Sequence, residues 1–164
     1  MMQYGKNKMI NTEKRLIPSD ILFSAISEEL EENRKATFTV TGMSMYPLLC
    51  HGRDQVIVST CQIEKLHIGD IVLFQTPENR YLLHRITQLK KETFISTGDG
   101  NSQRDGEFPF SCIIAQVTSI IRDSKRIECN GLKWNLFSYV WMFLFPIRKV
   151  MFKTWFHLRP YIKR

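Results

Sequence analysis

The chain has 164 residues, of which 43% are hydrophobic and 24% charged, a composition typical of one globular domain and unlike that of a disordered chain. The net charge of +7 is confined to one end. Of the 23 basic residues, seven lie in 131–164, which has no Asp or Glu, and the other 16 balance the 16 acidic residues of 1–130. We expect no signal peptide and no membrane-spanning helix, because no apolar stretch has the length of either.

The four cysteines stand at positions 50, 61, 112 and 129, and none belongs to a CxxC pair. This spacing disfavours a zinc ribbon or a thioredoxin-type site. Each cysteine lies in or beside an apolar run, where a free thiol behaves as a small hydrophobic side chain. We therefore expect four free thiols, a non-secretory context, and no metal or cofactor.

The predicted elements begin with a polar, basic and poorly ordered lead-in over residues 1–17. A helix is predicted from Pro18-Ser19-Asp20 to about Lys35, because Ser19 or Asp20 can cap it and apolar residues then recur on one face. Residues 1–35 are thus expected to form a lead-in and a helix.

Residues 36–130 are predicted to form a mostly β domain. Short stretches rich in β-branched and aromatic residues alternate with turn signals at 51–54, 68–70, 77–79 and 98–101. The expected strands are 37–41, 55–59, 71–75, 81–86, 93–96 and 112–121. Close spacing with little intervening helix favours a β-rich body over βαβ units.

A serine follows the first expected strand, in Thr41-Gly42-Met43-Ser44-Met45-Tyr46-Pro47. The glycine before it allows another backbone to come close, and the proline after it stiffens the chain. We expect this arrangement to hold the Ser44 hydroxyl at a fixed point beside an extended partner chain.

A histidine lies within the expected strand 81–86. Period-2 alternation places His84 on the same face as Leu82 and Ile86, with Leu83 and Arg85 on the opposite face. An imidazole between two apolar side chains is partly desolvated, which favours its neutral form and its use as a proton acceptor.

The third stretch is the loop Gly98-Asp99-Gly100-Asn101-Ser102-Gln103-Arg104-Asp105. Either of its carboxylates is suited to accept the N–H of His84, fixing the tautomer and stabilising the imidazolium. Both aspartates are equally suited to turn hydrogen bonds. Ser, His and Asp are the residue types that acyl transfer uses.

Four ordered stretches together resemble the motifs of type I signal peptidases: GMSMYP (42–47), GDIVLF (69–74), LLHRI (82–86) and GDGNSQRD (98–105). They span about residues 38–121. Because His84 stands where many bacterial members have lysine, the chain resembles the Ser-His branch. The resemblance implies a serine endopeptidase with the signal-peptidase and repressor-type β fold. It assigns Ser44 as nucleophile, His84 as general base and Asp105 as orienting acid, with Asp99 supporting the loop or sharing that role.

The resemblance also places an oxyanion hole and substrate contacts around the serine, at Gly42, Met43 and Met45. The Ser44 backbone N–H is the expected oxyanion donor. Some members add a hydroxyl at the position that is Gly42 here, so a side-chain donor is missing or comes from elsewhere, with Thr41 as a candidate. The implied substrate is an extended precursor peptide, cut after small residues and added as a strand beside residues 37–41.

Residues 131–164 combine aromatic and basic side chains, with ten of the 19 aromatic residues of the chain. Pro146 is expected to divide two helical pieces of an amphipathic tail. This composition suits a bilayer interface, so we expect peripheral or monotopic attachment to a membrane surface and no nucleic-acid partner.

Two other readings remain open. A repressor-type self-cleaving protease would share the fold, but it uses lysine as base, and Lys90 and Lys91 lie too far along the strand from His84. The chain is alternatively a membrane-binding or nucleic-acid-binding module with a degenerate catalytic site.

Overall fold

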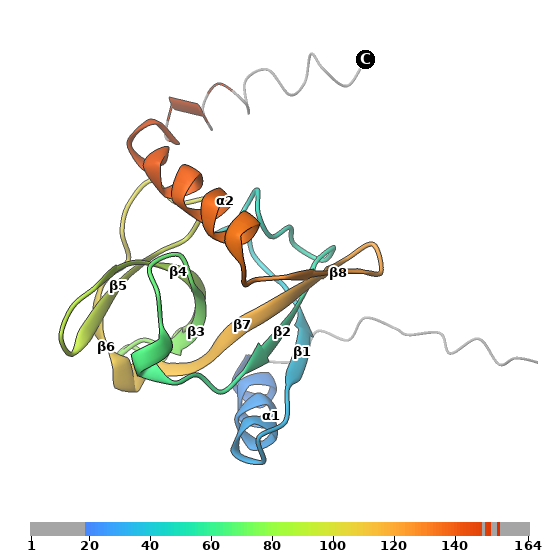
Figure 1. Ribbon diagram of the computed structural model, residues 1–164. Coiled ribbons are helices and arrows are strands. Elements are labelled where there is room, and N and C mark those ends of the chain that lie inside the picture. The colour runs from blue at the N-terminus through green and yellow to red at the C-terminus, as the bar shows by residue number, and fades with distance from the viewer. Residues whose placement is uncertain (1–18, 149, 152–153, 155–164) are drawn as a thin grey trace, which may run out of the picture.

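The computed structural model describes residues 19–148, 150, 151 and 154, and these form one antiparallel sheet with two α-helices (Figure 1). The prediction of a mostly β protein is therefore confirmed. The strands run in the order β1-β2-β7-β3-β4-β5-β6, and β8 also pairs with β7. Their bounds are β1 Ala36–Thr39, β2 Gln55–Ser59, β3 Ile71–Gln75, β4 Tyr81–Leu89, β5 Thr93–Thr97, β6 Gly106–Pro109, β7 Ile113–Arg122 and β8 Lys125–Glu128.

The long strand β7 joins the two halves of the sheet, because it pairs with β2 and with β3. One hydrophobic core lies against β1, β2 and β7 and includes Val56, Val58 and Val117. The second core lies within β3–β6 and is built around Phe74, Phe94 and Phe108. Aromatic contacts hold the second core together, with ring centroids of Phe74 and Phe94 5.3 Å apart.

The two helices lie at opposite ends of the body in Figure 1. Helix α1 spans Ser19–Glu31 and buries Ile26 and Leu30 in the first core. Helix α2 spans Leu132–Phe143 and is followed by the 3-10 turn η3, Phe145–Ile147, which contains Pro146. Two further 3-10 turns, η1 (Ile63–Lys65) and η2 (Phe110–Cys112), lie between strands. Among the described residues, no helix is both long and apolar enough to cross a bilayer.

Most predicted elements coincide with observed ones, and the differences have local causes. Helix α1 ends at Glu31 rather than near Lys35, because the chain turns at Asn33, whose φ is +56°. Strands β6 and β8 were not predicted; each has four residues, and β8, Lys-Arg-Ile-Glu, is exposed throughout. The lead-in 1–17, the side chains proposed to cap α1 and most of the chain beyond residue 151 lie outside the described residues.

Candidate active site

His84 and Asp105 form a direct side-chain pair. Nδ1 of His84 lies 2.6 Å from Oδ2 of Asp105, and the two side chains are 4% and 12% exposed. Strand β4 supplies the histidine, and Asp105 directly precedes β6. The same Oδ2 accepts a hydrogen bond of 2.8 Å from Oγ of Ser96 in β5, and the Asp105 N–H donates to the Ser96 carbonyl. Ser96 therefore fixes the carboxylate that faces the imidazole.

This pairing determines which imidazole nitrogen carries the proton. An ionised carboxylate only accepts hydrogen bonds, so Nδ1 of His84 is the N–H donor and the neutral ring presents Nε2 as an acceptor. Nε2 is buried and has no hydrogen-bond partner among the described residues. A buried, unpaired ring nitrogen is unusual, because buried polar atoms are generally satisfied. The Ser44 hydroxyl is therefore not hydrogen-bonded to Nε2 in this structure.

The packing of strand β4 agrees with the predicted alternation. Leu82 and Ile86 pack in the second core and Leu83 packs against the first. His84 lies between the first two along the strand and is 3% exposed. The strand therefore holds the imidazole in a low-dielectric setting, and among the described residues only the carboxylate of Asp105 lies at hydrogen-bond distance.

Ser44 lies in a turn that packs directly on the 98–101 loop. The Gly100 N–H donates a hydrogen bond of 2.7 Å to the Ser44 carbonyl, and the Asp99 N–H points at Sδ of Met45, 3.5 Å away. Because this loop continues to Asp105, the segment that carries the serine is attached to the segment that holds His84.

Glycine is required in this loop for close backbone approach. A Cβ placed on Gly98 would lie 2.4 Å from the Ser44 carbonyl oxygen, and one placed on Gly100 would lie 2.6 Å from the carbonyl oxygen of Met43. Both distances are well inside van der Waals contact with rigid backbone atoms. The Gly-Asp-Gly sequence thus allows the two turns to interlock.

Asp99 contacts Arg85 rather than His84. Nε and Nη2 of Arg85 donate to the two carboxylate oxygens of Asp99 at 2.9 and 2.7 Å, and both side chains are 1% exposed. A bidentate pair of this kind is strong and directional. Asp105 is thus the acid that contacts the imidazole. Asp99 anchors the same loop through Arg85, the residue next to His84.

The predicted oxyanion and substrate positions differ in exposure. Met43 is 53% exposed, whereas Met45 is buried in the first core. Gly42 adopts a φ of +86°, and its N–H donates to Nδ1 of His51 at 3.0 Å. That N–H is therefore occupied, and Met43 is the flanking side chain that faces solvent.

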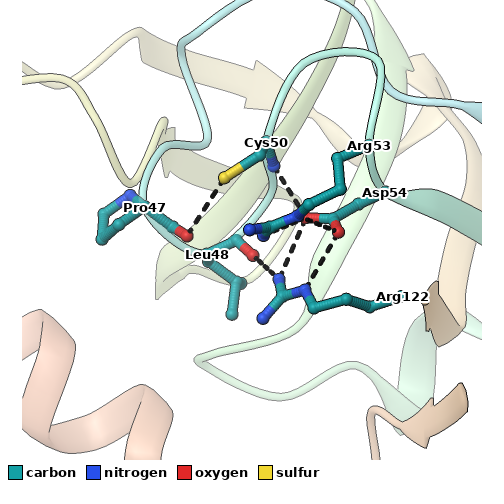
Figure 2. Close-up of polar contacts among 6 residues, drawn as sticks. All are labelled: Pro47, Leu48, Cys50, Arg53, Asp54 and Arg122. Carbon is teal, nitrogen blue, oxygen red and sulfur yellow. Dashed lines mark hydrogen bonds and ion pairs between the residues drawn. The ribbon is translucent and has the colours of Figure 1, made fainter.

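A second buried ion cluster braces the chain that follows Ser44 (Figure 2). Asp54 is fully buried and accepts paired hydrogen bonds from Arg53 and Arg122, at 2.8–2.9 Å, and one from the Cys50 N–H. Arg122 also donates to the Leu48 carbonyl. Burial alone would raise the pKa of Asp54, but the hydrogen bonds from Arg53 and Arg122 outweigh it and hold that pKa far below its usual value.

The sites for metal or thiol chemistry are limited. Within the described part of the chain, no three His, Cys, Asp or Glu side chains lie close enough to hold a metal ion. The four cysteines are free, as predicted. Burial raises the pKa of Cys129 to about 12, so this thiol is not a nucleophile near neutral pH. Lys90, one of the two lysines considered for the repressor-type alternative, lies just after the end of β4 and pairs with Glu107.

Comparisons with known proteins do not assign the chain to a family. No protein-family model matches the sequence, and no curated protein matches it significantly. The chemistry of the site is therefore inferred from the geometry described above and from the motif resemblance.

Some residues of the site were not predicted from the sequence. Three residues carried no motif signal: Ser96, which fixes Asp105, Ser138 of α2, which contacts Arg85, and Arg148 after η3, which approaches Asp99. Ser96 is opposite Ile86 in the β4–β5 ladder, so a correct strand register would have placed it next to the histidine. Ser138 and Arg148 contact partners about 50 residues away, which no local pattern reveals.

Proposed function

We propose that the chain is a serine endopeptidase similar to type I signal peptidases, with Ser44 as nucleophile and His84 as general base. The observation that carries the proposal is the His84–Asp105 pair, with a buried and unpartnered Nε2, in a body whose adjoining loop is hydrogen-bonded to the backbone of Ser44. Nucleophile, base and orienting acid are the three parts that acyl transfer needs.

In the proposed reaction, Nε2 of His84 removes the proton of the Ser44 hydroxyl as Oγ attacks the scissile carbonyl. The Asp105 carboxylate stabilises the imidazolium that forms and keeps Nδ1 protonated throughout. The imidazolium then gives its proton to the leaving amine, which releases the C-terminal fragment. Water attacks the resulting Ser44 ester with His84 again as base; the ester C–O bond breaks, the N-terminal fragment leaves with a free carboxyl group, and the imidazolium returns the proton to Ser44 Oγ.

The substrate is proposed to bind as an additional strand along β1. This strand is at the end of the sheet order and, in the part of the chain that the structure describes, pairs only with β2. A strand at such an edge has backbone groups available to an extended peptide. The turn carrying Ser44 begins shortly after β1, so a peptide bound there would pass the hydroxyl.

Cleavage of a defined peptide tests this proposal. The substrate is a synthetic leader with a basic start, an apolar stretch of about 10 residues and an Ala-Xaa-Ala site. We expect the wild-type chain to cut after the second alanine and Ser44→Ala to lose this activity, while Ser59→Ala, a matched change on β2, keeps it. Equal cleavage by wild type and Ser44→Ala would exclude Ser44 as the nucleophile.

We further propose that α2 attaches the enzyme to an anionic membrane surface. The outer face of α2 and the segment after it expose large apolar side chains, with Leu132 and Phe143 85% and 83% exposed. The other exposed members are Leu136, Phe137, Tyr139, Val140, Ile147, Val150 and Met151. Besides the buried Arg148, residues 131–164 contain six basic residues and no acidic residue, which favours an anionic lipid over a neutral one.

Vesicle flotation with the full-length chain tests the attachment. Binding to vesicles that contain phosphatidylglycerol should exceed binding to pure phosphatidylcholine, and Leu136→Ser combined with Phe143→Ser should weaken it by about tenfold or more. Competition by duplex DNA, or equal binding by the double variant, would contradict the membrane assignment.

A further inference from the structure

Helix α2 faces the body with Trp134 and Ser138 and exposes most of its other large apolar side chains. Both of these residues are buried, and Arg148, which directly follows η3, is 1% exposed. Residues 134, 138, 141, 145 and 148 follow the spacing of one helix face. This face meets the body beside Arg85 and Asp99, where Ser138 and Arg148 make polar contacts.

Ser138 completes the hydrogen bonding of Arg85. Nη1 of Arg85 donates to the Ser138 Oγ at 2.7 Å and to the Gly69 carbonyl at 2.7 Å, while its other nitrogens hold Asp99. The guanidinium is 1% exposed, so each of its donors has to find a protein acceptor. Removal of the Ser138 hydroxyl would leave a buried charged donor with one acceptor fewer.

Arg148 reaches the same loop from the position directly after η3. Its Nη1 lies 3.5 Å from the Asp99 carbonyl, and its guanidinium stacks 4.7 Å from the Trp141 ring centroid. Burial lowers the pKa of Arg148; Asp99 opposes this shift, and Arg85 adds to it. Two buried guanidinium groups therefore converge on Asp99, one on its carboxylate and one on its backbone.

The fit between α2 and the body depends on Gly69. A Cβ placed there would lie 3.2 Å from Cβ of Ser138 and 3.8 Å from Cε of Met142, and Gly69 has a φ of +104°. Glycine at this position lets the helix approach until the Ser138 hydroxyl reaches Arg85. The close packing of α2 on the body thus requires a residue without a side chain at position 69.

We propose that Ser138 and Arg148 are positioning residues of the peptidase site, which act through Arg85 and Asp99 to hold the 98–105 loop against Ser44 and His84. The inference rests on the proposed function. Arg85 is the neighbour of His84 in β4, and the residues that follow Asp99 hold the Ser44 carbonyl and supply Asp105. Helix α2 is accordingly part of the catalytic unit as well as its membrane-facing side.

The test compares Ser138→Ala with Asn135→Ala, an exposed position of the same helix, and Arg148→Met with Arg80→Met, an exposed arginine in the β3–β4 turn. Arg148→Lys is added as the conservative variant. Each full-length protein is assayed for kcat and KM on the leader peptide and for hydrogen exchange of the Gly100 amide. The exchange measurement needs no activity, because that amide donates to the Ser44 carbonyl.

We expect Ser138→Ala and Arg148→Met to lower kcat by about 10- to 100-fold with KM changed less than about threefold, since misplaced catalytic groups slow the chemical step. Gly100 should exchange about tenfold faster in both, Arg148→Lys should recover part of each effect, and the two controls should match wild type. Ser138→Ala decides the question if Arg148→Met does not fold, because alanine favours the helix.

Unchanged kcat and unchanged Gly100 exchange in Ser138→Ala would overturn the proposal, even if that variant melts at a lower temperature. If no variant and no wild-type protein cuts the peptide, the proposed function fails, and Gly100 exchange alone then decides whether α2 holds the loop. Faster exchange would support the positioning role, and unchanged exchange would refute it.

Discussion

Replacing Asp54 with asparagine should destabilise the protein strongly at neutral pH. Asp54 is fully buried, and its two oxygens accept paired hydrogen bonds from Arg53 and Arg122. The asparagine side chain keeps the shape but removes the negative charge between the two cations. Breaking a buried ion pair costs about 3–5 kcal/mol, and because Arg53 and Arg122 are 43% and 30% exposed and partly hydrated, we expect about 2–4 kcal/mol.

The cost of Asp54→Asn should depend on pH in a defined direction. The pKa of Asp54 is lowered in the folded protein, so the ionised form contributes stability above the unfolded value of about 3.9, and this contribution is lost as the pH falls below it. At pH 3 the unfolded aspartate is mostly protonated, while the folded one stays ionised. The difference in unfolding free energy between wild type and Asp54→Asn should therefore shrink by about 1 kcal/mol from pH 7 to pH 3.

Urea unfolding followed by circular dichroism measures both quantities. For a chain of this length, the expected destabilisation corresponds to a Tm lower by about 6–12 °C. Glu78→Gln is the matched control, because Glu78 is exposed and lies 3.9 Å from Arg80. A loss below about 0.5 kcal/mol at pH 7, or the same loss at both pH values, would refute the view that Asp54 is a buried, ionised anchor.

The remaining predictions concern the site and its surroundings. Asp105→Asn should lower kcat about 1000-fold or more with the fold retained, because asparagine no longer fixes the tautomer of His84; a fall of less than about threefold would contradict the role of Asp105. Gly98→Ala should abolish cleavage and lower the Tm, because its Cβ would lie 2.4 Å from the Ser44 carbonyl oxygen; an active, equally stable variant would show that the loops do not interlock. Burial raises the pKa of Cys129 to about 12, so this thiol should react with iodoacetamide at pH 8 at least about 100-fold more slowly in the folded chain than in guanidine. Mass spectrometry of the labelled peptides measures both rates, and equal rates would contradict its burial.

The sequence predicted the parts of the fold that local patterns encode. Strands such as β2, Gln55–Ser59, and β3, Ile71–Gln75, are short runs of β-branched and aromatic residues between turn signals. The alternation in β4 correctly separated Leu82 and Ile86 from Leu83. Strand β8 was not predicted because Lys-Arg-Ile-Glu has no apolar pattern. It forms a strand through its pairing with β7.

The contacts of the site were harder to predict from the sequence than the strands, because they join segments that are distant along the chain. The family resemblance assigned Asp105 to the histidine, but nothing in the sequence indicated that Asp99 would bind Arg85. The face of α2 was also not predictable from hydrophobicity. Its apolar residues are largely exposed, while Ser138 is buried to serve a guanidinium 53 positions earlier. Buried polar groups follow their partners rather than the apolar pattern.

Acid-quench mass spectrometry with an activated ester of the leader fragment shows whether Ser44 is the nucleophile, since acylation of the serine is then faster than hydrolysis and the acyl-enzyme accumulates. We expect one acyl group on the peptide that contains Ser44, absent from Ser44→Ala and strongly reduced in His84→Ala. Consumption of the ester at the wild-type rate by Ser44→Ala, or an acyl group located only on another residue, would contradict that assignment.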